Sequence, residues 1–198
     1  MLEIMKTEIT RADIMDMADY AKIRKEKRSQ LMPVKRNRRL AVGPYATFHF
    51  ESYDTMWLQV HEMLFIEKGG EAQIADELQA YNPLIPKGDE LVATVLFEID
   101  DPVRRRQVLG ALGGVEETMT IEFDGKVVKG EAEEDVDRTT ADGKASSVQF
   151  VHFRFTAEQA AAFRKADRVM VGITHPNYPH MTVLPEAVQA ALAEDLTV

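Results

Sequence analysis

The 198-residue sequence contains no cysteine, and this absence removes a group of chemistries at once. Disulfides, thiolate zinc sites, iron–sulfur clusters held by the chain and cysteine nucleophiles are all excluded. Long apolar runs are also missing, since the longest uncharged stretch, residues 169–185, contains three prolines. The N-terminus is charged and lacks the apolar segment of a signal peptide. We therefore expect a cytoplasmic protein without a membrane helix.

Several catalytic and cofactor motifs are missing as well. The sequence contains no GxGxxG, GxSxG or HExxH pattern. No glutamate is followed three residues later by histidine, which argues against a ferritin-type di-iron centre within this chain. We predict no cofactor and no metal from the sequence, and no enzymatic activity is indicated by a motif.

What the sequence does contain is typical of one soluble globular domain, with 45% hydrophobic and 29% charged residues. The net charge of −9 is unevenly distributed. Residues 22–39 hold nine Lys or Arg against Glu26 alone, a local charge of +8, so the remainder carries −17. This asymmetry is the clearest compositional feature of the chain.

The hydrophobic pattern predicts helices and strands in a mixed order. We expect a helix capped by Thr10 and ending before Pro33, and further helices at 55–68, 71–81, 102–112, 157–166 and 185–196. Strands are expected at 39–42, 46–51, 90–99, 118–123, 126–130, 145–155 and 168–174. The order predicts an α+β fold: one domain over 39–198, with a mostly antiparallel or mixed sheet and helices packed against it, preceded by a basic helix and arm over 1–38.

The helix predicted at 55–68 raises the possibility of a ligand pocket. Met56, Val60 and Leu64 form an apolar stripe, and Glu67 falls inside it on a helical wheel. A carboxylate on an apolar stripe must be paired, hydrogen-bonded, protonated or a ligand. The alternative is that Glu67, in the last turn, extends to solvent or pairs with an arginine of the basic arm. The pocket candidates are Glu51, Gln59, Glu62, Glu67, Tyr81, His175 and Tyr178.

Two further segments carry candidate ligand residues. His175 and His180 share a proline-rich segment, expected to be a stiff loop after a strand, which suits a metal, an anion or a plain structural turn. Residues 137–147 are similar to a phosphate-binding loop but fail the P-loop motif, so a hairpin turn is the better interpretation. Arg138 and Lys144 can still form a small anion site there.

The basic segment can bind nucleic acid, a partner protein or acidic parts of its own fold. It has little aromatic interleaving, and the rest of the chain repels phosphate, so nucleic-acid binding is disfavoured. Ion pairing within the chain or with a partner fits the charge split better. The candidate docking residues are Arg24, Lys25, Arg28, Lys35, Arg36, Arg38 and Arg39.

Several stretches of sequence, in order and over nearly the whole chain, resemble a bacterial family catalogued as domain of unknown function 3501. They are RRLAVGPYATFHFES, DTMWLQVHEMLFIEK, ELQAYNPLIP, the RTTADGKASSV hairpin and THPNY. The resemblance covers Glu51, Gln59, Glu62, Glu67 and His175, but implies no role for any of them. The chain departs from the family pattern at Phe65, usually basic, and at Gln149, where histidine is common.

The resemblance implies a link to peroxide or iron redox metabolism, since genes of the family often neighbour those of rubrerythrin-like and iron–sulfur proteins. We therefore expect an accessory, partner-binding protein of oxidative-stress metabolism whose partner supplies the metal chemistry. The helix at 55–68 also allows a homodimer. The alternatives are a small-molecule or metal-binding enzyme with a carboxylate, tyrosine and histidine pocket, and nucleic-acid binding through the basic helix.

Overall fold

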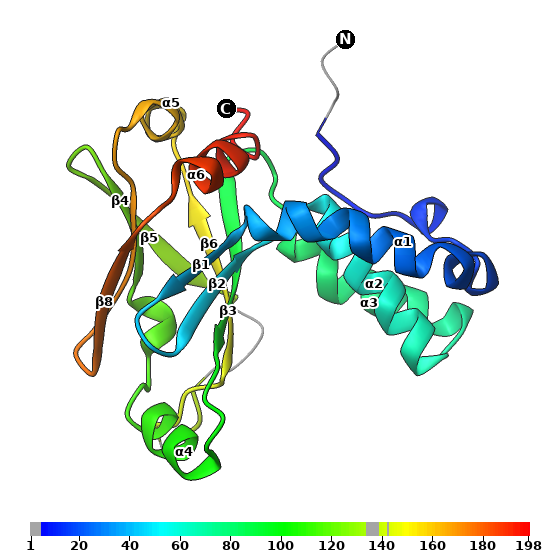
Figure 1. Cartoon of the computed structure of the whole chain (residues 1–198), viewed down its shortest axis with the longest axis horizontal. Helices are drawn as coiled ribbons and strands as arrows, with labels where there is room; N and C mark the ends of the chain where they lie inside the picture. Colours follow the sequence, from blue (N-terminus) through cyan, green and yellow to red (C-terminus); the bar gives the residue numbers. More distant parts are fainter. Residues whose placement is uncertain (1–4, 134–138, 142) are drawn as a thin grey trace.

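The computed structural model describes residues 5–133, 139–141 and 143–198 and has two parts, a sheet of eight strands and a layer of helices on one side of it (Figure 1). The strands are β1 (Arg39–Val42), β2 (Ala46–Phe50), β3 (Glu90–Phe97), β4 (Met119–Phe123), β5 (Lys126–Ala132), β6 (Val148–Arg154), β7 (Met170–His175) and β8 (Tyr178–Val183). The helices are α1 (Met17–Arg36), α2 (Tyr53–Glu67), α3 (Glu71–Tyr81), α4 (Pro102–Gly110), α5 (Ala157–Lys165) and α6 (Glu186–Ala193).

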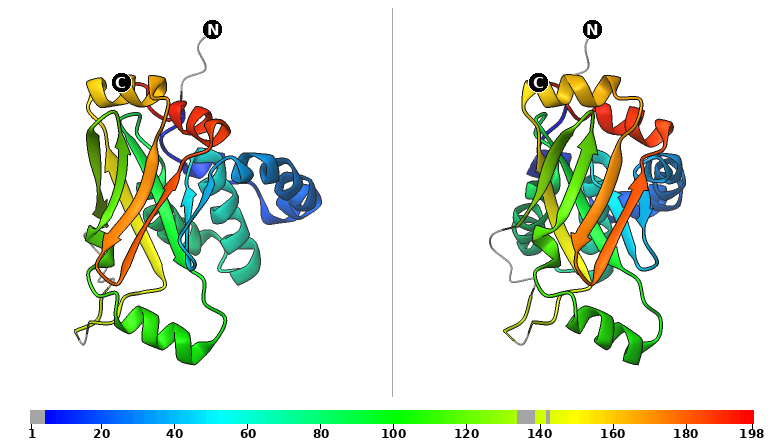
Figure 2. Two further views of the ribbon diagram at one scale, coloured as in Figure 1. Left: turned by 60° about the vertical axis from the view of Figure 1, so that its left-hand side comes forward. Right: turned by 90° about the vertical axis from the view of Figure 1, so that its left-hand side faces the viewer.

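All strand pairs are antiparallel, in the order β1-β2-β3-β6-β5-β4-β7-β8, and the sheet curls into a nearly closed barrel (Figure 2). One face of each strand fills the barrel with apolar side chains. In β2 and β3, for example, Phe48, Phe50 and Val95 point inward and are essentially inaccessible. The alternation of apolar and polar residues along these strands therefore places a second set of side chains on the outside of the barrel.

Side chains close the barrel where its two edge strands, β1 and β8, meet. The Tyr178 hydroxyl donates to the Val42 carbonyl at 2.8 Å and accepts from the Tyr45 and Ala46 amides. The Thr182 hydroxyl donates to the Ala41 carbonyl at 2.9 Å. Gly43 has φ +70°, and a Cβ there would lie 2.6 Å from the His180 ring, so only glycine fits this corner of the barrel.

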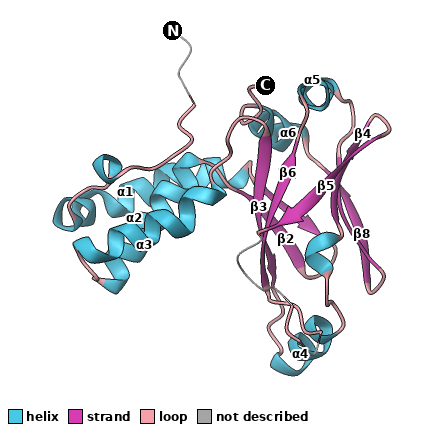
Figure 3. Cartoon of the chain, turned by 180° about the vertical axis from the view of Figure 1, so that it is seen from behind, coloured by secondary structure: helices cyan, strands magenta, loops and turns pink. Residues whose placement is uncertain are grey.

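The helical layer packs on the outer face of β2, β3 and β6, away from the barrel interior (Figures 1 and 3). Its separate small core contains Ile14, Met56, Val60 and Leu64 together with Val92 of the sheet. Helices α5 and α6 lie at one end of the barrel and α4 at the other (Figure 2). Two cores thus share one sheet, and the polar groups between them are positioned by both.

The predicted α+β class is confirmed, with a sheet that is entirely antiparallel and closes further than we expected. The bounds predicted for β1 and α3 are those observed, and Ser52 caps α2 by accepting from the Thr55 amide. The border predicted at residue 38 falls directly after α1, but α1 packs on α2 and shares its core.

Three predicted local features differ from the structure. The Thr10 cap starts only a short 3₁₀ turn, Arg11–Asp13, and α1 begins at Met17, where Asp16 accepts from the Ala18 amide. Helix α1 also continues through Pro33 to Arg36, because this proline lies on the exposed side, where water can satisfy the carbonyl left unpaired one turn earlier.

The segment from His175 to His180 is not a stiff loop. It forms the end of β7, a tight turn at Pro176 and Asn177, and the start of β8. Strand β8 is an edge strand, where proline is tolerated, and Pro179 pairs opposite Thr174 in the register of this hairpin. The prolines in this stretch therefore led us to predict a loop where strand β8 begins.

In the described ranges, no helix has both the length and the apolar character needed to span a bilayer.

Candidate functional site

Helix α1 is held against α2 by a polar cluster that contains one of the predicted pocket residues, Glu62. Arg24 forms a bidentate ion pair with Glu62, with both N–O distances 2.8 Å, and the Tyr20 hydroxyl donates to the same carboxylate at 2.6 Å. The hydrogen bonds from Arg24 outweigh the opposing effect of burial and lower the pKa of Glu62 to about 2. Glu62 is therefore a fixed anion that anchors the basic helix rather than a free ligand.

A second arginine of the basic segment, Arg38, is buried at the end of α1. Its guanidinium donates to both carboxylate oxygens of Asp195, at 2.7 and 2.8 Å, and to the backbone carbonyl of Glu51. Arg38 is 7% exposed, so this candidate docking residue does not reach a partner. The clamp instead joins α1 to the C-terminal segment that follows α6.

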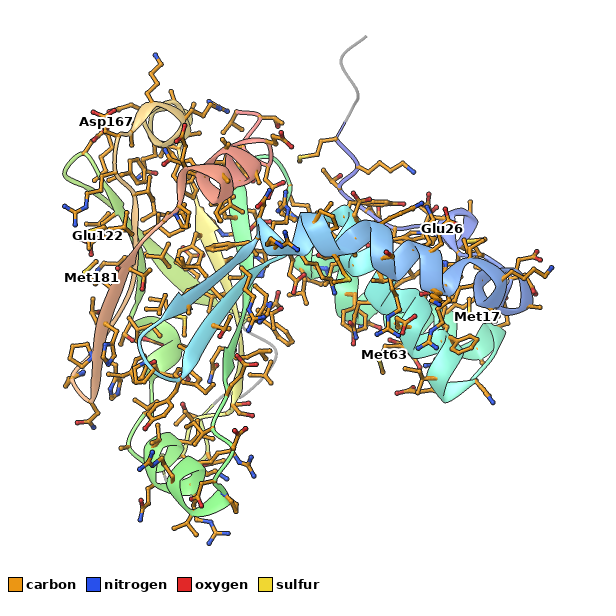
Figure 4. The ribbon with its side chains drawn as sticks, in the orientation of Figure 1. Met17, Glu26, Met63, Glu122, Asp167 and Met181 are labelled. Carbon is orange, nitrogen blue, oxygen red and sulfur yellow. The ribbon has the colours of Figure 1, made fainter. Side chains whose placement is uncertain are left out.

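The remaining basic residues of α1 face solvent, as does Arg39 at the start of β1. Arg39 lies 3.9 Å from Glu98, a weak exposed pair. Of the predicted docking residues, Lys25, Arg28, Lys35 and Arg36 are exposed and have no ion pair in the described part of the chain. Glu26, labelled on α1 in Figure 4, is the lone acidic residue of the basic segment.

Between α1 and α2 runs a groove of about 630 Å³, here called the basic groove. Apolar atoms of Leu58, Phe65 and Met32 contribute to its surface, and Met32 is 63% exposed. The guanidinium of Arg24 lies over the Phe65 ring at 4.6 Å, and basic side chains supply the charge. The full lining is Ala21, Arg24, Lys25, Arg28, Ser29, Met32, Lys35, Leu58 and Phe65.

A smaller cavity of about 230 Å³, here called the Glu51 pocket, lies where the end of α1 and the first turns of α2 meet the outer face of β2 and β3. Two predicted pocket residues, Glu51 and Gln59, line it together. The whole lining is Lys35, Arg38, His49, Phe50, Glu51, Thr55, Gln59, Thr94 and Leu96.

Glu51 is held firmly inside this cavity. Its two carboxylate oxygens accept hydrogen bonds from the hydroxyls of Thr55, at 2.6 Å, and Thr94, at 2.7 Å. Burial raises the pKa of Glu51, and these hydrogen bonds and the positive charges of Lys35 and Arg38 only partly oppose the rise. The environment therefore favours the neutral carboxylic acid more than an exposed site would.

His49, which the sequence did not single out, lies in the same cavity. Its Nε2 atom is buried and has no hydrogen-bond partner within the described residues. Burial, with a smaller contribution from Arg39, lowers the pKa of His49, so the ring is neutral near pH 7. The available signal was the alternation along β2, which places His49 on the side opposite to Phe48 and Phe50 and therefore outside the barrel.

The other predicted pocket residues lie elsewhere. Exposed Glu67 accepts from the Gln73 amide at 2.7 Å, so it extends to solvent at the end of α2. Tyr81 packs at the edge of the small helical core. His175 contacts the Gly113 carbonyl and accepts from the Asn177 amide, and Tyr178 closes the barrel. The seven candidates therefore do not share one pocket.

The predicted anion site cannot be assembled from the described residues. Arg138 lies outside them, and Lys144 is exposed in a short turn in which the backbones of Thr140 and Lys144 bond to each other at 2.8 Å. Thr139 and Ala145 form one isolated antiparallel bridge in the segment for which a hairpin turn was predicted.

The sequence also gave no indication of a cluster formed by His152 and two carboxylates. His152 lies on the outer face of β6 between two carboxylates, with Nδ1 2.8 Å from Glu90 and Nε2 2.6 Å from Glu133. Burial alone would lower the pKa of His152, but the two hydrogen-bonded carboxylates together reverse this and raise it. Strand pairing creates this cluster, and spacing along the chain carries no sign of it.

Among residues 5–133, 139–141 and 143–198, no three or more His, Asp or Glu side chains form a cluster suited to a metal ion.

Comparison with known proteins gives a family and a solved relative. A family model described as "Protein of unknown function (DUF3501)" matches residues 8–196. The chain is similar to a crystal structure of a novel protein of unknown function from Burkholderia pseudomallei K96243, with 33% identity and a TM-score of 0.87. This match covers 95% of the present chain and 98% of the other. No curated protein matches the sequence.

Proposed function

The chain belongs to the DUF3501 family of proteins of unknown function, and we propose that it is a partner-binding protein whose basic groove receives an acidic segment of another protein. The observation that carries this proposal is that the basic residues of α1 and of the short segment after it fall into two groups, one used within the chain and one not. Arg24 forms an ion pair with Glu62 and Arg38 forms one with Asp195, and these two pairs fix the helix in place. Lys25, Arg28 and Lys35 are left at the groove.

The composition of the groove favours a protein segment as occupant. Its apolar floor of Leu58, Phe65 and Met32 can bury aliphatic side chains, while the basic side chains pair with carboxylates. Complementary charge chiefly raises the association rate and selects the partner. Two copies of this chain each carry a net charge of −9 and repel at long range, which disfavours a second copy as the occupant.

The resemblance of the sequence suggests which partner to try first, a rubrerythrin-like or iron–sulfur protein. This link to redox metabolism is a prediction from gene neighbourhood alone. The apolar faces of α2, on which the homodimer prediction rested, are largely covered by α1, α3 and the sheet within the chain, which weakens the support for a dimer through α2.

The test is a binding measurement with a purified rubrerythrin-like protein from the same organism, at about 50 and about 200 mM salt. We expect binding that weakens at the higher salt and is lost in the Lys25→Glu/Arg28→Glu variant. A matched control, Arg104→Glu/Arg106→Glu, makes the same charge change on exposed residues of α4.

Three results would overturn the proposal: absence of binding to rubrerythrin-like and iron–sulfur proteins alike, equal loss in both variants, or binding only to a DNA duplex in the same assay. The last would favour the nucleic-acid interpretation of the basic helix.

A further inference from the structure

The Glu51 pocket has features that partner docking does not explain. It lies behind the basic groove, at the junction of α1, α2 and the outer face of the sheet, and three of its polar groups are not used by the fold. His49 Nε2 is buried without a partner, and the side chains of Lys35 and Gln59 form no hydrogen bond or ion pair within the described ranges. Buried polar atoms are nearly always satisfied, so an unpaired imidazole nitrogen beside a cavity calls for an occupant.

The electrostatics of the cavity select an anion. Lys35 and Arg38 supply positive charge, and the first turn of α2, which begins at Tyr53, adds the positive end of a helix dipole. Arg38 is already engaged by Asp195, which leaves the Lys35 ammonium as the available cation. The Glu51 carboxyl group is already hydrogen-bonded by the Thr55 and Thr94 hydroxyls, and the uncharged His49 ring offers hydrogen bonding without adding a charge.

The size of the cavity limits the ligand to a small one. At about 230 Å³ it is smaller than the roughly 300–1,000 Å³ of pockets that hold drug-sized molecules. A single free ammonium matches one negative charge, and a dianion such as phosphate would need more donors than the cavity presents. Leu96 adds some apolar lining.

We propose that the Glu51 pocket binds a compact monocarboxylate, with the carboxylate paired to Lys35 and a hydroxyl or carbonyl group hydrogen-bonded to His49 and Gln59. Glu51, held by Thr55 and Thr94, forms the polar wall against which the ligand packs. This site is separate from the partner groove except for Lys35, which borders both.

The experiment follows the histidine ring signals of the full chain by ¹⁵N NMR during titration with acetate, lactate, pyruvate and, separately, inorganic phosphate. His49 is identified among the five histidines by the signal that disappears in His49→Gln. We expect at least one monocarboxylate to shift the His49 signal in a saturable way, while His152, on a different part of the sheet, is unchanged.

Two variants of α1 then test the site. Lys35→Gln removes the ammonium from an exposed position and should weaken binding about tenfold, the effect of one lost charge-assisted hydrogen bond. Lys25→Gln makes the same change on the same helix at a residue that borders only the groove, and should leave the affinity unchanged.

The proposal is overturned if no carboxylate moves the His49 signal, if phosphate alone does so, or if Lys35→Gln and Lys25→Gln bind equally well. Since Lys25 and Arg28 carry the docking test and do not line the Glu51 pocket, failure of one proposal is distinguishable from failure of the other.

Discussion

The barrel and the helical layer are stabilised in different ways, although they share β2, β3 and β6. The barrel interior is almost entirely apolar, with Phe48, Phe153 and Ile121 inaccessible to solvent, and it holds one buried amide, Gln149, whose Oε1 has no partner in the described structure. The helical layer has a small apolar core and relies on polar contacts between its elements. The Trp57 indole donates to the Asp13 carbonyl, and His61 accepts from the Met15 amide.

The difference indicates where each part of the molecule can carry function. An apolar barrel tolerates little change and offers no chemistry on its inside. The helical layer places charged and hydrogen-bonding side chains on the outer face of the same sheet, and both the basic groove and the Glu51 pocket lie there. The rigid barrel thus supports a polar surface to which its own outward-facing residues, His49 and Thr94, contribute.

The largest expected loss of stability is in the barrel core. Phe153→Ala should lower the free energy of unfolding by about 4 kcal/mol, because it removes a fully buried ring. Ile74→Ala, at the edge of the helical core with 8% exposure, should cost about 2 kcal/mol. Urea unfolding of both variants measures the difference, and equal losses would contradict the distinction between the two cores.

The next effect concerns the clamp between the two parts. Arg38→Met leaves the Asp195 carboxylate buried without its partner and should cost about 3 kcal/mol. The double variant Arg38→Met/Asp195→Leu removes both charges and should recover most of this loss in the same unfolding measurement. A double variant as unstable as the single one would show that the guanidinium acts through its bonds to backbone carbonyls instead.

A smaller loss is expected at the barrel corner. Gly43→Ala should cost about 2 kcal/mol, since the residue has φ +70° and its new Cβ would meet the His180 ring and the Tyr178 hydroxyl. Gly110→Ala is the control, because no atom lies within 4 Å of a Cβ there and alanine favours the end of α4. The midpoint temperature of thermal unfolding should fall for Gly43→Ala and not for Gly110→Ala.

The polar anchor of the helical layer should respond to acid. The pKa of Glu62 is lowered from 4.5 to about 2, so its stabilising contribution is present above about pH 4.5 and is lost as the pH falls toward 2. Glu62→Gln should cost about 1–2 kcal/mol at pH 7 and flatten this part of the stability profile. The control Glu67→Gln, at an exposed position, should change neither the free energy of unfolding at pH 7 nor its dependence on pH.

The smallest effect is expected above neutral pH and has the opposite sign. Because the two carboxylates raise the pKa of His152 above 6.5, its contribution is fully present below that pH and declines as the pH rises through the folded-state value. Stability measured from about pH 6 to about pH 9 should fall less in His152→Gln than in the wild type. An identical slope in both proteins would mean that the imidazole is neutral throughout.

Local patterns foresaw most of the secondary structure but little of its assembly. Strand β1 and helix α3 are set by hydrophobic patterns among neighbouring residues, and each was found with the predicted bounds. Strand β8 was missed because its proline, Pro179, is unfavourable in a central strand and acceptable at an edge. Edge position is a property of the whole sheet and is invisible in a short stretch.

The candidate sites were foreseen only in part, for the same reason. Glu51 and Gln59 were predicted because a carboxylate and an amide beside an apolar helix need polar partners, and the two residues do line one cavity. The sequence led us to consider pairing with an arginine of the basic arm only for Glu67. In the structure it is Glu62, one or two turns away on the same helix, that forms this pair. His49 could not be found, since its importance depends on Lys35 being brought beside it by α1.

The phenol of Tyr178 has a consequence for how this protein behaves at high concentration. Every sheet with free edges is a template on which another copy can add a strand and begin to aggregate. By bonding to Val42, Tyr45 and Ala46, the Tyr178 hydroxyl holds the edge strand β8 against the corner between β1 and β2 and so restricts access to both edges. Tyr178→Phe should therefore increase the tendency to self-associate, which light scattering of the concentrated variant would reveal.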